Sequence, residues 1–183
     1  MSEQEYLKSE LSSDVKHEYI DGQAYAMAGG TENHNLITGN ISRKFGNHLK
    51  NSHCKTFASD MMISAGNDKF YPDVVVVCDK HAPRIIVEVF SKSTLHLDKG
   101  KKLLQYINIP SLKEYVMIEQ NVTSIDVLRK SEGWIPRNYT LGENIHFESI
   151  DLTLSVEEIY HRVENEDMTK FLETNLGIQG TIL

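Results

Sequence analysis

Two runs of consecutive β-branched residues lie near the middle of the chain, at Val74–Val77 and Ile85–Val87. Continuous apolar runs of this kind are typical of central strands that are buried on both faces of a sheet. The runs therefore predict interior strands over Phe70–Val77 and Ile85–Phe90. A third strand is predicted at Glu114–Ile118, where apolar residues return.

Helical spacing of apolar residues flanks these strands. The spacing predicts a helix over Glu32–Asn51, with Thr31 as its N-cap. A second helix is predicted over Leu97–Ile107, and Pro110 prevents its continuation. The order strand, strand, helix, strand favours an α/β (α+β) fold whose mixed sheet contains a crossover connection.

Shorter elements are expected on both sides of this centre. Asp21-Gly22 is a strong two-residue turn signal and predicts an added N-terminal hairpin. The other expected elements are a helix at Glu5–Leu11, hairpin strands His17–Ile20 and Gln23–Met27, a strand Thr56–Ser64, a C-terminal meander of Ser124–Arg129, Trp134–Tyr139 and Ile145–Phe147, and a last helix capped by Ser155 and Glu158. Residues 165–183 have weak periodicity, which is compatible with an arm that packs on a partner subunit or with a frayed terminus.

Length and composition indicate an ordinary globular protein. The 183 residues favour a single domain over 1–183, with 40% hydrophobic and 25% charged residues. No apolar run approaches the roughly 20 residues that span a bilayer, and the N-terminal residues lack an apolar signal segment. Two cysteines, Cys54 and Cys78, are too few for a disulfide scaffold or a four-thiolate zinc site. A reduced, cytoplasmic setting is the simplest expectation.

The net charge of −7 argues against a non-specific nucleic-acid coat protein, since phosphate binding needs clustered cations. It does not exclude a nuclease, because a bound metal ion adds local positive charge. Lys99, Lys101 and Lys102 also form a basic cluster in this otherwise acidic chain.

Each of the two apolar strands carries one acid, Asp73 and Glu88. An unpaired buried carboxylate is costly, so such acids are normally paired, protonated or bound to a metal. If the strands are neighbours, the two carboxylates converge at one end of the sheet. With the backbone carbonyl of Val89 and water, they would suit Mg²⁺ or Mn²⁺.

The following helix presents Asp98, Lys102 and Tyr106 at i, i+4 and i+8, so the three share one face. Lys102 could stabilise charge on a phosphate or orient the attacking water, Asp98 could hold Lys102, and Tyr106 could donate to either acid. Taken singly, an Asp–Lys pair is most often a solvated salt bridge and Pro72-Asp73 is often a turn. The ordered combination carries the signal.

At this point the chain resembles the Uma family of restriction-endonuclease-like proteins, within the PD-(D/E)XK nuclease superfamily. The resemblance covers roughly residues 6–163. It is carried by Pro72-Asp73, Glu88-Val89-Phe90-Ser91, Ser93-Thr94, Asp98, Lys102, Tyr106 and Glu114-Tyr115, with His17–Gly22, Met27–Gly30, His34-Asn35 and Leu154–Tyr160 in support.

The resemblance implies a mixed β-sheet core flanked by helices and a Mg²⁺-type nuclease site. Asp73 and Glu88 would take the two metal-binding acid positions. The lysine that the superfamily pattern places two residues after the second acid is Phe90 in this chain. Lys102, from the following helix, fits the role instead.

Glu18 and His34 are supporting candidates. Glu18 could reach the metal site or orient Lys102, or it could be an exposed strand residue. His34, near the start of the long helix, could shuttle protons or contact phosphate, or it could be a surface residue.

The leading hypothesis is therefore a divalent-metal-dependent DNA endonuclease, expected to be a homodimer. A nuclease fold that no longer cuts and serves as a binding or assembly module is the second hypothesis. A hydrolase of small phosphoesters is the third.

Overall fold

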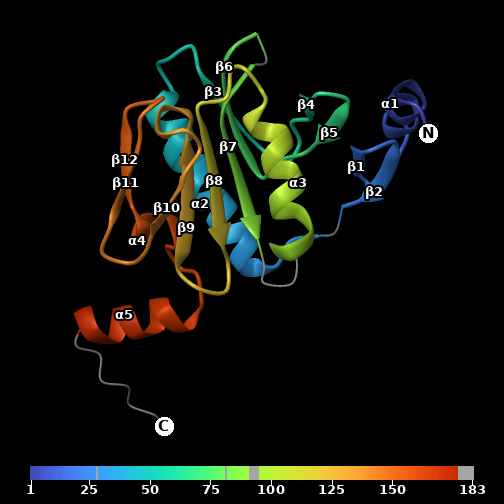
Figure 1. The fold of residues 1–183 in the computed structure, drawn as a ribbon. Helices are drawn as coiled ribbons and strands as arrows, with labels where there is room; N and C mark the ends of the chain where they lie inside the picture. Colours follow the sequence, from blue (N-terminus) through green and yellow to red (C-terminus); the bar gives the residue numbers. More distant parts are fainter. Residues whose placement is uncertain (28, 81, 91–94, 177–183) are drawn as a thin grey trace.

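A six-stranded mixed sheet forms the centre of the computed structural model, in the order β10-β9-β8-β7-β6-β3 (Figure 1). The structure describes residues 1–27, 29–80, 82–90 and 95–176, without the side chains of residues 95–99, 101 and 176. The sheet contains β3 (Lys55–Ala58), β6 (Val74–Asp79), β7 (Ala82–Phe90), β8 (Glu114–Glu119), β9 (Ser124–Arg129) and β10 (Pro136–Tyr139). β7 and β8 run parallel and the other neighbours are antiparallel, which confirms the predicted mixed sheet.

Alternate residues of β6 and β7 face two separate hydrophobic cores. Val74 and Val87 belong to the first core, which packs against α2 (Glu32–Leu49). Val75 and Ile86 belong to the second core, which contains Tyr106 of α3 (Leu95–Ile107). Because side chains alternate along a strand, a strand covered on both faces needs apolar residues at every position. This is why both runs are continuous.

A smaller four-stranded sheet, ordered β2-β1-β5-β4, supports the second core. Its strands are β1 (His17–Ile20), β2 (Gln23–Ala26), β4 (Ile63–Ala65) and β5 (Asp68–Phe70). The predicted hairpin is confirmed, with Asp21 and Gly22 at φ of 50° and 80° in its turn. Before it, α1 (Glu3–Glu10) begins at Ser2, whose side chain forms a capping box with Glu5.

Two predicted strands are wrong as single elements. Thr56–Ser64 is divided between β3 and β4, and Phe70–Val77 is divided between β5 and β6. The first break contains Ser59 at φ 58°, a left-handed conformation that a regular strand does not tolerate. The second contains Pro72, which has no N–H to donate to a strand ladder. The chain uses both breaks to pass between the two sheets.

The predicted C-terminal meander is only partly right. β9 and β10 extend the central sheet, but β11 (Asn144–Phe147) pairs with β12 (Leu152–Ser155) in a separate two-stranded sheet. Both strands of this sheet bury residues in the first core. Ser155 then caps α4 (Val156–Ile159), and the predicted capping box with Glu158 is confirmed.

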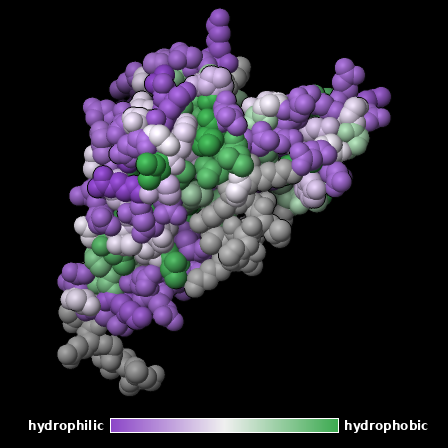
Figure 2. All heavy atoms as spheres, in the orientation of Figure 1, coloured by the Kyte–Doolittle hydropathy of each residue, from purple (hydrophilic) through white to green (hydrophobic). Residues whose placement is uncertain are grey.

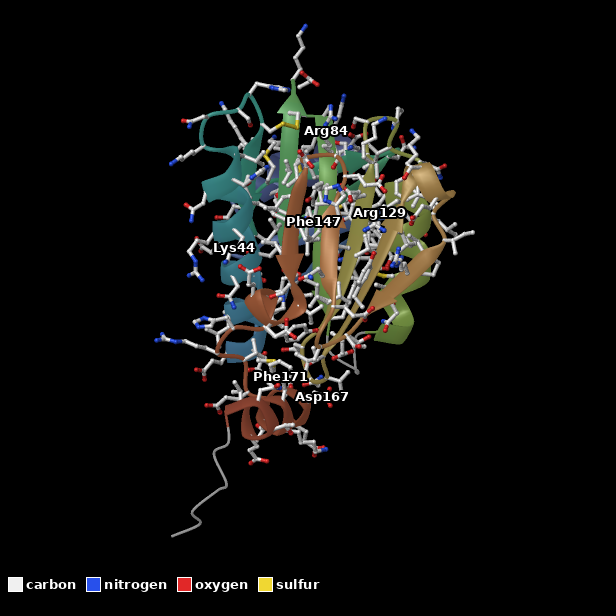
Figure 3. All side chains as sticks on the ribbon, turned by 90° about the vertical axis from the view of Figure 1, so that its left-hand side faces the viewer. Lys44, Arg84, Arg129, Phe147, Asp167 and Phe171 are labelled. Carbon is white, nitrogen blue, oxygen red and sulfur yellow. A yellow bond between two sulfur atoms is a disulfide. The ribbon has the colours of Figure 1, made fainter. Side chains whose placement is uncertain are left out.

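A helix, α5 (Glu166–Leu176), occupies most of the tail, so a frayed end is wrong for that stretch. Met168 anchors α5 in the first core, and Asp167 accepts a hydrogen bond of 2.8 Å from the Thr123 amide. Figure 3 shows α5 across one end of the molecule, with Asp167 and Phe171 labelled. Residues 177–183 lie outside the described part of the chain, and packing on a partner subunit stays a prediction.

Cys54 and Cys78 form a disulfide, which corrects the expectation of reduced thiols. The two residues come together because β3 and β6 are antiparallel neighbours, a pairing that residue spacing does not reveal.

On the surface, the face drawn in Figure 2 is largely hydrophilic, with apolar residues in small patches. Among the described residues no helix has the length and apolar character needed to cross a membrane.

Candidate active site

Asp73 and Glu88 meet at the end of the sheet where β7 finishes and α2 begins (Figure 1). Val74 pairs with Val87 across the antiparallel β6–β7 ladder. Continuing this register by one position sets Asp73 opposite Glu88, and cross-strand partners project from the same face of a sheet. The two predicted acids are therefore neighbours, as the sequence hypothesis requires.

Glu88 is buried, with 5% of its surface exposed. The Tyr106 hydroxyl donates a hydrogen bond of 2.9 Å to its Oε1, and Lys102 Nζ lies 3.8 Å from the same oxygen. Burial raises the pKa of the Glu88 carboxyl to about 8; the Lys102 ammonium opposes this shift, and the Asp73 and Glu18 carboxylates add to it. Burial likewise holds the pKa of Tyr106 well above its ordinary value, so its hydroxyl keeps the proton that it donates.

The site lysine comes from α3. Lys102 Nζ lies 2.8 Å from Oε1 of Glu18, a buried residue of β1, and 5.9 Å from the centre of the Phe70 ring. Glu18 is thus not an exposed strand residue, and it contacts Lys102 as one of the two expected roles requires. Phe90, at the position where the superfamily pattern has a lysine, is buried in the second core.

Two contacts hold the Asp73 carboxylate. The Val89 amide donates a 2.7 Å hydrogen bond to Oδ2, and His34 Nε2 lies 3.1 Å from Oδ1. The hydrogen bond to Asp73 raises the pKa of the His34 imidazole, against the opposing effect of burial. His34 therefore contacts the site rather than lying free on the surface. The carbonyl of Val89 as a metal ligand stays a prediction.

Sequence reasoning predicted Thr31 as the N-cap of α2 but missed its partner Gln120, which helps to fix the position of His34. Thr31 caps α2 by accepting a hydrogen bond from the His34 amide, and its hydroxyl donates to Gln120 just after β8. The Gln120 amide in turn donates to the Phe90 carbonyl at the end of β7. A polar residue that directly follows a buried strand was the available signal for Gln120.

Gly30 is the other missed residue. A Cβ built on Gly30 would lie 2.6 Å from His34 Nδ1, closer than real Cβ contacts allow. Nδ1 is itself buried, and within the described part of the chain it has no hydrogen-bond partner. The imidazole therefore lies between the Gly30 backbone and Asp73. The available signal was the pair Gly29-Gly30 directly before a helix cap.

The backbone of Asp98 belongs to α3, but its side chain lies outside the described residues, as do those of Lys99 and Lys101. The role of Asp98 therefore stays a prediction.

A protein-family model described as "Putative restriction endonuclease", Uma2, matches residues 3–157. The chain belongs to the Uma2 family. An uncharacterized protein of Synechocystis sp. is 36% identical to this Uma2 chain over 173 residues, covering 87% of the chain and 91% of the relative. A second uncharacterized Synechocystis protein is 32% identical over 159 residues, covering 79% and 89% respectively.

Among solved structures, "a putative nuclease belonging to DUF820" from Anabaena variabilis has the same fold, with a TM-score of 0.71 and 16% identity. The alignment covers 87% of this Uma2 chain and 97% of that protein. The Uma2 chain is thus a restriction-endonuclease-like protein with a nuclease-like fold. Families of this kind generally use divalent metal ions.

Proposed function

We propose that this Uma2 protein is a divalent-metal-dependent endonuclease of the PD-(D/E)XK type that hydrolyses DNA phosphodiester bonds. The observation that carries the proposal is the meeting of Asp73 and Glu88 at one sheet end, with the Lys102 ammonium 3.8 Å from Glu88. Asp73, Glu88 and Lys102 are the proposed catalytic residues, and Asp73 and Glu88 the proposed metal ligands.

The donor set fits Mg²⁺ or Mn²⁺. Glu18, Asp73 and Glu88 bring three carboxylates to a partly buried site, where they contact the basic groups of Lys102 and His34. Burial and carboxylate repulsion hold the pKa of Glu88 near 8, so the site favours an added positive charge. Hard divalent cations prefer oxygen ligands, and a bound cation would take the place of the Glu88 proton.

When bound, the metal ion would polarise a phosphate oxygen and lower the pKa of a water molecule. The protein side chains then have separate tasks. Asp73 and Glu88 hold the cation, and Lys102 supplies positive charge to the phosphate as negative charge develops. Tyr106 orients Glu88, Glu18 keeps Lys102 over the site, and His34 fixes one oxygen of Asp73.

The test is cleavage of a supercoiled plasmid with Mg²⁺ or Mn²⁺. Asp73→Asn, Glu88→Gln and Lys102→Met should each lower the cleavage rate by about 100-fold or more, because each removes a metal ligand or the phosphate-facing charge. Asp151→Asn and Glu166→Gln are matched controls, since those acids are 97% and 90% exposed and lie outside the site. Equal activity in the three site variants and the wild type would overturn the proposal.

Calorimetry separates the alternatives. A nuclease fold that no longer cuts would bind neither Mg²⁺ nor Mn²⁺ at millimolar concentration. A small-phosphoester hydrolase would bind the metal, but its rate of cleaving a nitrophenyl phosphodiester would be the same with and without duplex DNA. An endonuclease should bind the ion in a manner that requires Asp73 and Glu88, and its rate should depend on duplex length.

The oligomeric state and location belong to the same proposal. We expect a homodimer, because a duplex offers two strands to cut, and sedimentation analysis would give the mass directly. A DNA substrate is also consistent with action in the cytoplasm, which cell fractionation tests.

A further inference from the structure

A second group of metal-ligand side chains lies at the opposite end of β6 from Asp73. Cys78 belongs to β6 and Cys54 directly precedes β3; the register that pairs Lys55 with Val77 sets the two cysteines opposite each other, where they form the disulfide. His53 Nε2 lies 3.9 Å from Cys54 Sγ, and the ligand atoms of all three residues lie within 4.8 Å of one another. Figure 3 draws the disulfide at the end of the sheet near the labelled Arg84.

We propose that in the reduced protein Cys54, Cys78 and His53 bind a zinc-class divalent cation, which oxidation to the disulfide releases. Two thiolates and an imidazole are the ligand types that Zn²⁺ prefers, and Mg²⁺ does not favour them. The site is therefore chemically distinct from the oxygen-ligand site of Asp73 and Glu88, and the inference does not depend on nuclease activity.

The distances already approach those of a tetrahedral zinc site. Zn–S and Zn–N bonds of about 2.3 and 2.0 Å imply about 3.8 Å between two sulfurs and about 3.5 Å between sulfur and nitrogen. The imidazole nitrogen of His53 is 3.9 Å from Cys54 Sγ before any adjustment. Once the disulfide is reduced, the two sulfurs must move apart, and the imidazole must approach them by a small rotation of its exposed side chain.

Solvent can deliver the ion and a fourth ligand. The side chains of His53 and Asp79 are each 70% exposed, and Asp79 Oδ1 lies 3.9 Å from His53 Nε2. The other Asp79 oxygen is 3.7 Å from the Arg84 guanidinium. Either Asp79 Oδ1 or a water molecule can complete the coordination. Cys54 is partly exposed, so a reductant can reach the sulfur pair.

The reaction balances with a phosphine as the reductant. The phosphine attacks one sulfur and the S–S bond breaks; water then supplies the oxygen of the phosphine oxide and the protons of two thiols. Zinc binding forms two Zn–S bonds and releases those two protons, so binding strengthens as pH rises. Reoxidation uses a small-molecule disulfide as the oxidant: thiol–disulfide exchange re-forms the Cys54–Cys78 bond, the added disulfide is reduced to two thiols that take up two protons, and the ion is released.

The experiment uses the full chain and Co²⁺ as the probe. The protein is reduced with a phosphine, desalted without oxygen, shown to contain two thiols by a colorimetric assay, and titrated with Co²⁺. We expect thiolate-to-cobalt charge-transfer absorption and tetrahedral d–d bands that saturate at one ion per chain. Zn²⁺ should displace the Co²⁺, and the oxidised protein should give no such bands.

Variants locate the site. Cys78→Ser should weaken binding at least 100-fold, and His53→Gln about 10-fold with the charge-transfer band retained. His146→Gln is the matched control, because His146 is 51% exposed with Asp151 at 3.8 Å and is not among the residues clustered with the thiols. Asp73→Asn should leave the bands unchanged. Reduced wild type without these bands, or Cys78→Ser with wild-type affinity, would overturn the inference.

Discussion

At the scale of single residues, the main feature of the site is the repulsion between carboxylates that lie close together. Glu88 shares its surroundings with Asp73 and Glu18, while Lys102 contacts two of these three acids. Repulsion and burial act in the same direction on Glu88, and both favour its protonated form. An excess of acid in a buried site costs stability when no cation is bound, which is typical of sites selected for function rather than for stability.

A pH dependence follows for the metal-free protein. Glu88 has its pKa raised to about 8 in the folded state from 4.5. A raised pKa stabilises the fold below pH 4.5, and this stabilisation is lost as pH rises to about 8. Glu88→Gln removes the titrating group, so its free energy of unfolding should increase relative to wild type between pH 4.5 and 8.

Urea denaturation in a metal chelator, at several pH values across that window, measures this difference. Glu166→Gln serves as the control because its side chain is 90% exposed. A difference between Glu88→Gln and wild type that stays constant with pH would contradict the raised pKa.

Gly30 offers a second residue-scale prediction. Gly30→Ala should displace the His34 ring from Asp73, because the new Cβ would lie 2.6 Å from Nδ1. We expect the pKa of His34 to fall toward its ordinary value and the metal affinity of the site to drop about 10-fold. NMR titration of the histidine ring protons checks the first effect. Gly39→Ala is the control, since a Cβ at that position would meet no described residue within 4 Å beyond its chain neighbours and its own helix backbone. An unchanged His34 pKa would contradict the contact.

At the scale of elements, a buried ion-pair network attaches the C-terminal strands to the central sheet. Arg129 of β9 and Glu114 of β8 are 3% and 1% exposed. Arg129 donates to the Tyr139 hydroxyl and the His146 carbonyl, while Glu114 accepts from the Glu148 and Ser149 amides. β8, β9, β10 and β11 are thereby joined, and Figure 3 labels Arg129.

Arg129→Met should lower the free energy of unfolding by about 3 kcal/mol, because it leaves the Glu114 carboxylate buried without its cation. Lys170→Met is the matched control: its ion pair with Glu166 is exposed, and we expect a change below about 0.5 kcal/mol. The double variant Arg129→Met, Glu114→Gln should recover part of the loss. Guanidinium denaturation measures all three, and equal losses for Arg129→Met and Lys170→Met would argue against the network.

At the scale of the whole molecule, the central sheet separates two chemically different ends. One end holds the carboxylates and Lys102, and the other holds the disulfide between β3 and β6. Helix α2 runs from one of these ends to the other: it starts near Asp73 and finishes at Leu49, shortly before Cys54. The disulfide therefore closes the loop that runs from Cys54 through β3, β4 and β5 to Cys78 of β6.

The sequence separation of 24 between Cys54 and Cys78 sets the expected effect of this closure. Cross-linking a loop of this length should stabilise the fold by about 3 kcal/mol through the entropy of the unfolded chain. The double variant Cys54→Ala, Cys78→Ala should therefore unfold at lower denaturant concentration than the oxidised wild type. The phosphine-reduced wild type is the reference, and equal stability of its oxidised and reduced forms would contradict a cross-link in solution.

Local patterns in the sequence determined much of the fold. The β-branched runs of β6 and β7 established burial on both faces, and the apolar spacing with Thr31 predicted α2 to within a few residues. The acids Asp73 and Glu88, and the face that Lys102 shares with Tyr106, were visible for the same reason. Periodicity and turn chemistry act over a few residues, so the chain records them directly.

Only the tertiary structure decided which distant residues meet. Strand order and register decide four features that the sequence does not specify. They are the pairing of Glu18 with Lys102, the position of His34 between Gly30 and Asp73, the splitting of two predicted strands, and the Cys54–Cys78 bond. These quantities are set by the packing of whole elements against two cores. Spacing along the chain specifies the face on which a side chain lies, but the neighbour that covers this face is chosen by packing.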